Sequence, residues 1–248
     1  MKINKILLIF KKAPFPAIMT IISFVLFIGV YLLTTVKSIE PYYFESLIFT
    51  VPFLCFGTIT FLSVTKRLKV VASSVITSIL IVVLGVAALV ALTFMSIQTA
   101  TTITSDIGKY ERVLKQTGFP NNELTKYFPS KIPDNAKNIV FRYNPAFLQG
   151  GENFDLKFET DSDSIMNYIE DFSKNSKWIG KSKDSEAEKN GIFSGMFNVF
   201  GYMDMPEDFT IYLIDSKPYQ LNNWNHGKVT LVAISKQRNE IIFYAENW

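Results

Sequence analysis

Three long apolar segments fill most of the first 97 residues and constrain the fold more than any other feature of the sequence. They run from about residue 16 to 36, 44 to 64 and 70 to 97, and their only charged side chain is Glu45, at the edge of the second segment. At about 1.5 Å rise per residue, each helix could cross a hydrocarbon core about 30 Å thick. We therefore expect a transmembrane anchor of three helices over residues 1–97 and a separate domain over residues 98–248.

The basic residues of the short connecting segments predict the orientation of the anchor. The loop between the first and second segments holds only Lys37, beside Glu40. The two other flanks are strongly basic and contain Lys2, Lys5, Lys11, Lys12, Lys66, Arg67 and Lys69. We expect a multi-pass protein of the cell membrane with a cytoplasmic N-terminus and an extracytoplasmic C-terminal domain. No small-residue cleavage pattern follows the first segment, so we expect it to be retained as a span rather than removed as a signal peptide.

The unequal distribution of charge explains the basic isoelectric point of about 8.7. Residues 1–97 carry 8 basic and 2 acidic side chains, whereas residues 98–248 carry 17 basic and 20 acidic ones. The excess positive charge therefore belongs to the membrane anchor, where it favours contact with the inner leaflet. The partner that this pattern predicts is the lipid bilayer, not nucleic acid.

Small residues recur along the third apolar segment, at Ser74, Ser78, Gly85, Ala87 and Ala91. Such a stripe lets helix backbones approach closely in lipid, and we expect it to pack against the other two spans. The alternative, a polar path for a solute, lacks the acidic or basic residue in midspan that coupled transport usually requires.

Residues 98–248 alternate between helical and strand patterns, which predicts an α+β domain on a mostly antiparallel sheet. Two helices are expected, at Thr104–Thr117 and at Ser162–Asn175. Gly118 should end the first, which could continue from the third span as one stalk. The proline-rich passage between Phe119 and Pro133 is expected to be extended. Strands are expected at 139–143, at 154–158 with one face in water, and at 209–214, 229–235 and 240–245, the last two joined by a hairpin around Lys236–Asn239.

The passage Phe193–Phe200 fits either a helical face or a strand. Its aromatic side chains could fill the core or line a groove for a ligand or peptide, and the sequence leaves both possibilities open, although core packing is favoured.

Candidate catalytic residues are few, and each has a structural explanation that the pattern favours. The single histidine, His226, lies in Asn222–Gly227, which is typical of a turn, and the single cysteine, Cys55, lies in the second span. The pair Gly150–Gly151 lacks the lysine and the helix of a phosphate-binding loop. Two acidic groups, Asp161–Ser162–Asp163–Ser164 and Asp204, Glu207 and Asp208, are better explained by helix capping and by a solvated turn than by calcium binding or glycoside hydrolysis. We assign no catalytic, cofactor-binding or metal-binding residue and expect no cofactor.

The stretch Tyr127-Phe128-Pro129-Ser130-Lys131-Ile132-Pro133, followed by Phe141, Tyr143 and Phe147-Leu148-Gln149-Gly150-Gly151, has a distinctive spacing of proline, aromatic and glycine residues. It resembles the outer domains of a loose group of uncharacterised bacterial membrane proteins and lipoproteins, many of them from Gram-positive species. The resemblance extends from about Leu124 to Trp248. It implies no activity and no catalytic residues.

Three functional hypotheses follow. The first is a non-enzymatic, membrane-anchored extracytoplasmic domain that binds a protein, an envelope component or a small ligand. The second is an accessory or immunity-type membrane protein that acts through its transmembrane helices. The third is a cell-envelope hydrolase that depends on a pair of carboxylates.

Overall fold

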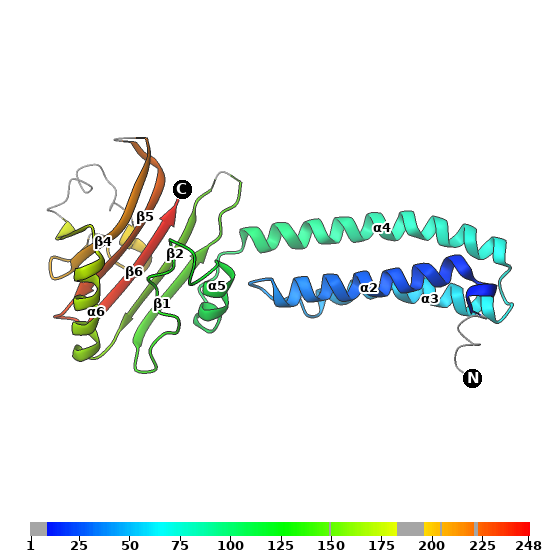
Figure 1. Cartoon of the computed structure of the whole chain (residues 1–248), viewed down its shortest axis with the longest axis horizontal. Helices are drawn as coiled ribbons and strands as arrows, with labels where there is room; N and C mark the ends of the chain where they lie inside the picture. Colours follow the sequence, from blue (N-terminus) through cyan, green and yellow to red (C-terminus); the bar gives the residue numbers. More distant parts are fainter. Residues whose placement is uncertain (1–8, 149, 183–195, 204, 221–222) are drawn as a thin grey trace. The chain divides into compact units, whose positions relative to one another are not determined.

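The computed structural model describes residues 9–148, 150–182, 196–203, 205–220 and 223–248, without the side chains of residues 196, 218–220 and 223–226. The chain divides into two compact units, Met1–Thr99 and Ala100–Trp248, and each is considered by itself. The first is helical, and the second contains a six-stranded sheet with helices (Figure 1).

The first unit contains the three expected helices. They are α2 (Pro14–Val36), α3 (Thr50–Val64), which is preceded by the 3₁₀ helix η1 (Glu45–Phe49), and α4 (Val70–Thr101). All three spans, with η1 counted as part of the second, are long and apolar enough to cross a membrane. The predicted three-helix anchor is therefore confirmed as an architecture, with bounds that differ by a few residues from those expected.

Hydroxyl groups join α2 to the second span. Thr20 and Thr60 lie 3.2 Å apart through their Oγ1 atoms, and Thr34 Oγ1 lies 2.6 Å from Ser46 Oγ. At one end of the hairpin, Lys12 Nζ donates to the carbonyl oxygen of Val64 at 3.3 Å. The basic segment before α2 and the basic loop after α3 therefore meet at the same end of this unit.

The buried face of α4 differs from the predicted stripe of small residues. Ser73, Thr77 and Met95 are buried, whereas Ser78, Gly85 and Ala87 are exposed. Ser74 and Ala91 are half-buried, and Gly85, Ala87 and Ala91 border spaces that face the other spans, so the expectation is correct only in part. Because small residues occur on two adjacent sides of α4, their spacing alone could not determine which side faces the neighbouring helices.

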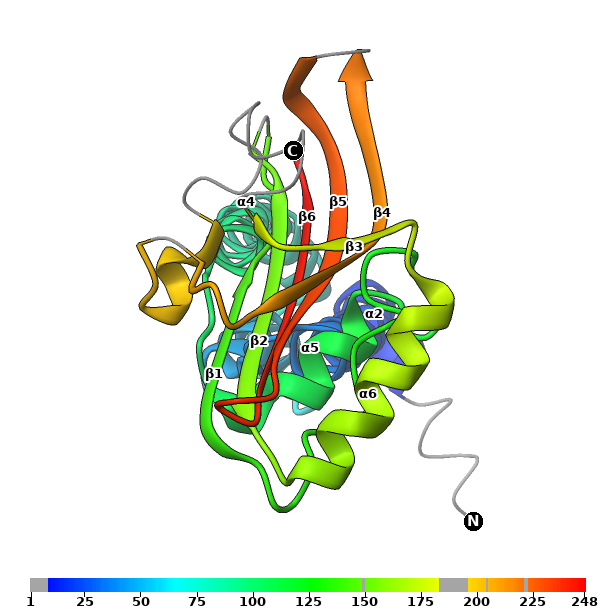
Figure 2. The ribbon, with the colours of Figure 1, turned by 90° about the vertical axis from the view of Figure 1, so that its left-hand side faces the viewer.

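The second unit is built on an antiparallel sheet with strand order β1-β2-β6-β5-β4-β3. Its strands are β1 (Lys137–Asn144), β2 (Glu152–Glu159), β3 (Trp178–Gly180), β4 (Thr210–Gln220), β5 (Asn223–Ser235) and β6 (Glu240–Asn247). Helices α5 (Tyr110–Gln116) and α6 (Ser162–Asn175) lie on one face, and the 3₁₀ helix η4 (Met196–Phe200) lies on the other (Figure 2). The predicted α+β class and the bounds of α6 are confirmed.

Three local predictions were wrong or incomplete. The first helix does not begin at Thr104 or continue α4, because residues 102–106 leave the helical conformation and η2 (Ile107–Lys109) precedes α5. The passage from Phe119 to Pro133 consists mainly of turns rather than extended chain. The short strand β3 was missed, since three residues give no periodic signal. Gly118, with a φ of +96°, ends the helical region as predicted.

Aromatic rings form the core between the sheet and its two helices, on the surface that we call the helix face. Phe243 occupies its centre and contacts rings from three directions, including Phe128 at 5.4 Å, Phe158 at 6.0 Å and Phe172 at 5.9 Å between centroids. Tyr110 of α5 meets Phe141 edge to face at 5.4 Å. Large buried rings of this kind remove much apolar area from water and so stabilise this domain.

The other surface of the sheet, the opposite face, has a second apolar cluster. Phe197, Phe200, Met205 and Phe209 pack there against buried side chains of β4, β5 and β6. This cluster overturns the prediction of a wet face on β2, because Asp155 on that side is fully buried and Lys157 is largely covered. Alternation along β2 distinguishes its two sides but does not show that a later segment of the chain covers the polar one.

Candidate functional site

One edge of the sheet makes a single strand pairing on its outer side over the described residues. Strand β1 is the edge strand, and it is paired with β2 on its inner side. On its outer side, Tyr143 exchanges two backbone hydrogen bonds with Thr104, at 2.8 and 3.0 Å, in an isolated antiparallel bridge. The chain then turns away, because Asp106 caps η2 by accepting a hydrogen bond from the backbone N–H of Gly108 at 3.0 Å.

The backbone N–H and C=O of Phe141 point to the same side of β1 as those of Tyr143. In an antiparallel strand, N–H and C=O groups point to alternate sides every second residue, so the pairing of Tyr143 with Thr104 fixes the direction for Phe141. Within the part of the chain that the structure describes, no backbone group bonds to Phe141 from this side. Phe141 is only 2% exposed, so the neighbouring chain already covers most of this backbone.

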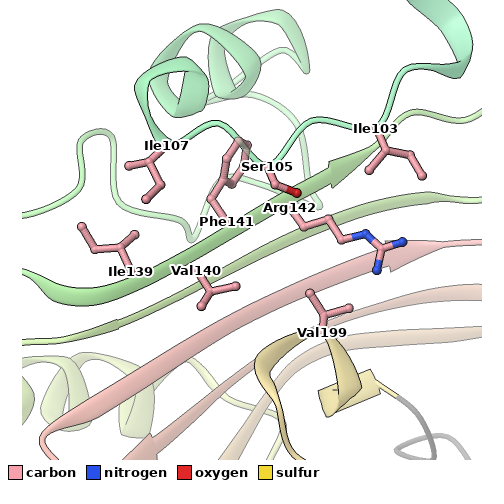
Figure 3. Close-up of a pocket in the computed structure, with 8 residues that line it drawn as sticks. All are labelled: Ile103, Ser105, Ile107, Ile139, Val140, Phe141, Arg142 and Val199. Carbon is pink, nitrogen blue, oxygen red and sulfur yellow. The ribbon is translucent and has the colours of Figure 1, made fainter.

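A groove of about 460 Å³ follows this edge (Figure 3). Ile103, Ser105 and Ile107 border it on the side of the chain that leads to α5, and Val199 of η4 borders it on the other. The remaining lining residues are consecutive in β1, from Ile139 to Arg142. The groove therefore runs along the strand rather than into the core.

The side chains of the groove combine apolar surface with one positive charge. Ile103 is 49% exposed and Ile107 is 42% exposed, although both are large apolar residues beside a packed core. Arg142 is the only charged residue among the eight that line the groove. In Figure 3 its guanidinium extends along the groove, on the same side of β1 as Val140.

A buried carboxyl lies directly across from Arg142. Asp155 is its partner in the β1–β2 register, and the amide of Asn153, with its nitrogen turned toward the carboxyl, donates to Asp155 Oδ1 at 3.1 Å. Burial raises the pKa of Asp155 to about 8, even though the Arg142 guanidinium favours the charged form. Near neutral pH the carboxyl is therefore mostly protonated and offsets little of the positive charge of Arg142.

A second polar group lies further along the opposite face. Lys157 Nζ is 3.6 Å from Glu240 Oε1 and donates to the carbonyl oxygen of Phe200 at 3.1 Å. The hydroxyl of Tyr202 lies 2.9 Å from both carboxylate oxygens of Glu240, and Lys157 and Arg238 lie over its ring. Because its members bond one another, this group anchors η4 and the following loop to the sheet.

The acidic groups singled out in the sequence have structural roles where the structure describes them. Asp161 caps α6 by accepting from the backbone N–H of Ser164 at 2.7 Å, which lowers the pKa of Asp161. Asp208 pairs with Arg238 at 2.8 Å and accepts from Ser235, and the Arg238 hydrogen bond lowers its pKa. Asp204 lies outside the described residues. Over the described residues, no group of three or more His, Cys, Asp or Glu side chains is placed to hold a metal ion.

The other candidates are also dispersed. His226 belongs to β5, so the prediction of a turn at 223–227 was wrong, because the β4–β5 hairpin extends past the end of β6. Cys55 lies in α3, far in sequence from any other candidate. Gly151 permits a close approach to the C-terminal strand, because a Cβ atom there would lie 2.5 Å from the carbonyl oxygen of Asn247.

The aromatic passage that the sequence left open is part of the core where it is described. Phe197 and Phe200 are buried in the apolar cluster of the opposite face, whereas residues 193–195 lie outside the description. Val199, between them, is the residue of η4 that reaches the groove.

Comparison with protein-family models, with curated proteins and with solved structures finds no match to this chain. The resemblance to outer domains of bacterial membrane proteins therefore stays a prediction. The class of protein that the fold itself defines is a chain with three membrane-spanning candidate helices and an antiparallel α+β unit.

Sequence reasoning missed the groove because its parts are distant along the chain. Ile103, Ser105 and Ile107 precede α5, Arg142 lies in β1 and Val199 lies in η4. The only local signal was the isoleucine pair, whose spacing of four suits a buried helical stripe equally well.

Proposed function

We propose that this protein is a non-enzymatic, membrane-anchored binding protein whose C-terminal domain, outside the cytoplasmic membrane, captures a protein of the cell envelope. The observation that carries this proposal is the groove along the edge strand β1, where two exposed isoleucines lie near the guanidinium of Arg142. Exposed apolar surface bordered by polar groups is typical of protein-binding sites.

The expected orientation is supported by the arrangement of the basic residues. Lys12 contacts the end of α3, so the basic segment before α2 and the basic loop 65–69 belong to one end of the helical unit. Positively charged ends are retained in the cytoplasm, which leaves the far end of α4 outside. A cysteine at Ile179, in a Cys55→Ser background, is expected to react with a membrane-impermeant maleimide in intact cells. A cysteine at Lys66 is expected to react only after lysis, and the reverse pattern would refute the orientation.

Site-specific photocrosslinking in intact cells tests the binding function. A photoreactive amino acid at Ser105, inside the groove, is expected to give a discrete covalent adduct with another protein. The matched control places the same amino acid at Met166, which is exposed on α6. No adduct at Ser105, or the same adducts from both positions, would contradict the proposal. Turnover of esters, glycosides, phosphates or peptides by the purified protein would contradict its non-enzymatic part.

A second candidate function rests on the membrane helices. An apolar groove of about 260 Å³ lies between the α2–α3 hairpin and α4, bordered by residues such as Phe27, Phe56 and Leu84. Such a space could admit a helix of a membrane partner, as an accessory protein would require. Replacing residues 1–97 with three unrelated spans separates the two candidates. Retained crosslinking from Ser105 favours the binding domain, and its loss favours the spans.

A further inference from the structure

We propose that the groove beside β1 binds the juxtamembrane segment of another membrane protein, that is, the few residues just outside that protein's own membrane anchor, with an acidic side chain of this segment on Arg142. This inference rests on the proposed binding function and orientation, and it names the class of partner. The ligand is a polypeptide held at the outer surface of the bilayer, acidic close to its anchor and apolar further out.

Hydroxyl groups mark the outer end of the helical unit. Thr99, near the end of α4, has its Oγ1 atom 3.4 Å from the hydroxyl oxygen of Tyr42 and 3.5 Å from Ser38 Oγ. Ser38 and Tyr42 belong to the segment that joins α2 to the second span, beside the charged residues Lys37 and Glu40. Polar and charged groups of this kind belong in the headgroup layer, which is about 5–8 Å thick on each side of the hydrocarbon core. Thr99 therefore lies at the membrane surface.

The length of the chain limits how far the groove can lie from this surface. Helix α4 ends at Thr101, and Ile103, the first residue that lines the groove, follows closely. Two helical steps of about 1.5 Å and two extended steps of about 3.5 Å keep the Cα atom of Ile103 within about 10 Å of that of Thr99. This limit holds for every orientation of the domain. The near end of the groove is therefore in the headgroup layer or just above it.

Arg142 lies at this near end. It precedes Tyr143, whose backbone bonds that of Thr104 at 2.8 and 3.0 Å, and in Figure 3 its guanidinium is at the Ile103 end of the groove, whereas Ile107 borders the far end. The side chains of Ile103, Ile107 and Arg142 all keep accessible surface. A segment that leaves its own anchor and enters the groove meets the cation first and the apolar wall afterwards. This order sets the sequence of the ligand, acidic and then apolar.

The position of the groove disfavours a soluble partner. A folded domain of about 100 residues has a radius of gyration of about 13 Å, so its bulk would meet the headgroups before its surface filled a groove that begins this close to them. A juxtamembrane segment is narrow, and its own anchor holds it at the required height. Confinement of both proteins to one membrane also raises their effective concentration without any further contact.

Two other occupants fit less well. Residues 98–248 carry 17 basic and 20 acidic side chains, so the domain as a whole has no electrostatic attraction to an anionic lipid surface. The outer loop of a second copy of this chain is short, and its residues Ser38 and Tyr42 are held beside Thr99 of α4, which keeps the loop from rising into the groove. Both occupants are outcomes that the experiments below distinguish.

Mapping the adduct from Ser105 in intact cells tests the inference. With the photoreactive amino acid at this position of the full-length protein, we expect an adduct with another membrane protein. The attachment site should lie within about ten residues of the outer end of its anchor. Attachment to a soluble protein, to a site remote from any anchor, to lipid or to a second copy of this chain would overturn the inference. A soluble partner would leave the binding function standing, whereas the absence of any protein adduct would refute both.

Raising the domain above the membrane tests the dependence on height. Insertion of about 18 helix-forming Ala, Glu and Lys residues between Ala100 and Thr101 adds about five turns and lifts the groove by about 27 Å. We expect the yield of the Ser105 adduct to fall about tenfold. The matched control inserts the same number of Gly and Ser residues, which let the domain return to the surface and should lower the yield much less. Equal yields from the two variants would overturn the inference. Limited proteolysis checks that the domain stays folded in both.

Arg142→Gln tests the acidic position of the ligand. Loss of the cation is expected to lower the yield of the Ser105 adduct about fivefold, the size of one exposed ion pair. Lys217→Gln, which removes an exposed cation from β4, should leave the yield unchanged. Equal yields from Arg142→Gln and the unchanged chain, or a mapped segment without Asp or Glu, would overturn the inference.

Discussion

The two faces of the sheet are buried by different chemistry. The helix face is filled by rings of Phe141, Phe154, Phe158 and Phe243 beneath α5 and α6. The opposite face mixes an apolar cluster with Asp155, Lys157 and Glu240, which are also covered. This difference teaches that burial in this domain does not separate polar from apolar residues. One face is filled by aromatic rings, and the other holds a buried ion pair within its apolar cluster.

The largest effect is expected at the centre of the helix face. Phe243→Ala removes a ring that packs against both α6 and the proline-rich passage, and we expect it to lower the free energy of unfolding by about 3–5 kcal/mol. Phe200→Ala on the opposite face should cost less, because a short 3₁₀ helix can shift to close the cavity. Amide hydrogen exchange of β6 in the full-length protein measures both. Equal losses would show that the two faces do not differ in stability.

The next effect concerns the charged group of the opposite face. Lys157→Ala leaves Glu240 buried without its cation, and we expect a loss of about 3 kcal/mol. Replacing both residues together, with Lys157→Met and Glu240→Leu, should cost much less than the single change, because no unpaired charge remains. The same exchange experiment reports both variants. A double variant that is less stable than Lys157→Ala would mean that the ion pair itself stabilises this face.

The raised pKa of Asp155 predicts that the stability of the domain depends on pH. Its pKa is raised from 3.8 to about 8 by burial, so the folded state holds a proton that the unfolded state releases above about pH 4. The contribution of this proton to the free energy of unfolding is therefore complete below the unfolded pKa of Asp155. It is lost as the pH rises toward 8. Between pH 5 and 7 the loss is about 2–3 kcal/mol. Asp155→Asn should flatten this part of the profile in chemical denaturation, and an unchanged slope would assign it to other groups.

The smallest of these effects is expected at Tyr202. Its hydroxyl bonds both oxygens of Glu240, while its ring lies beneath Lys157 and Arg238. Tyr202→Phe keeps the ring and removes the hydroxyl, so we expect a loss of about 1–2 kcal/mol. Exchange of the Phe209–Thr210 amides should rise in this variant, while that of α6 should not. A matching rise in α6 would show that the two faces unfold as one unit.

Several elements were predictable because their signals are local. Ser162–Asn175 combines an apolar stripe with a capping aspartate, and both follow from the helical period of 3.6 residues. Strand β2 shows strict alternation of aromatic and polar residues. By contrast, β3 is too short for any period, and the extension of β5 through His226 depends on pairing with β4 rather than on its own composition.

The groove was beyond local reasoning. Ile107 and Arg142 are ordinary residues in their own segments, and only the path of the chain from α4 into α5 places one beside the other along β1. The same holds for Asp155, whose burial depends on chain that follows it by tens of residues.

The sequence by itself determined the three apolar helices, the placement of charge around them and the α+β class of the remainder, because hydropathy and periodicity act within a single segment. Only the tertiary structure decided which side of α4 is buried, that both faces of the sheet are covered and that a groove follows β1 at one edge. These features depend on which distant segments meet, and contacts between distant segments leave no pattern in either segment alone.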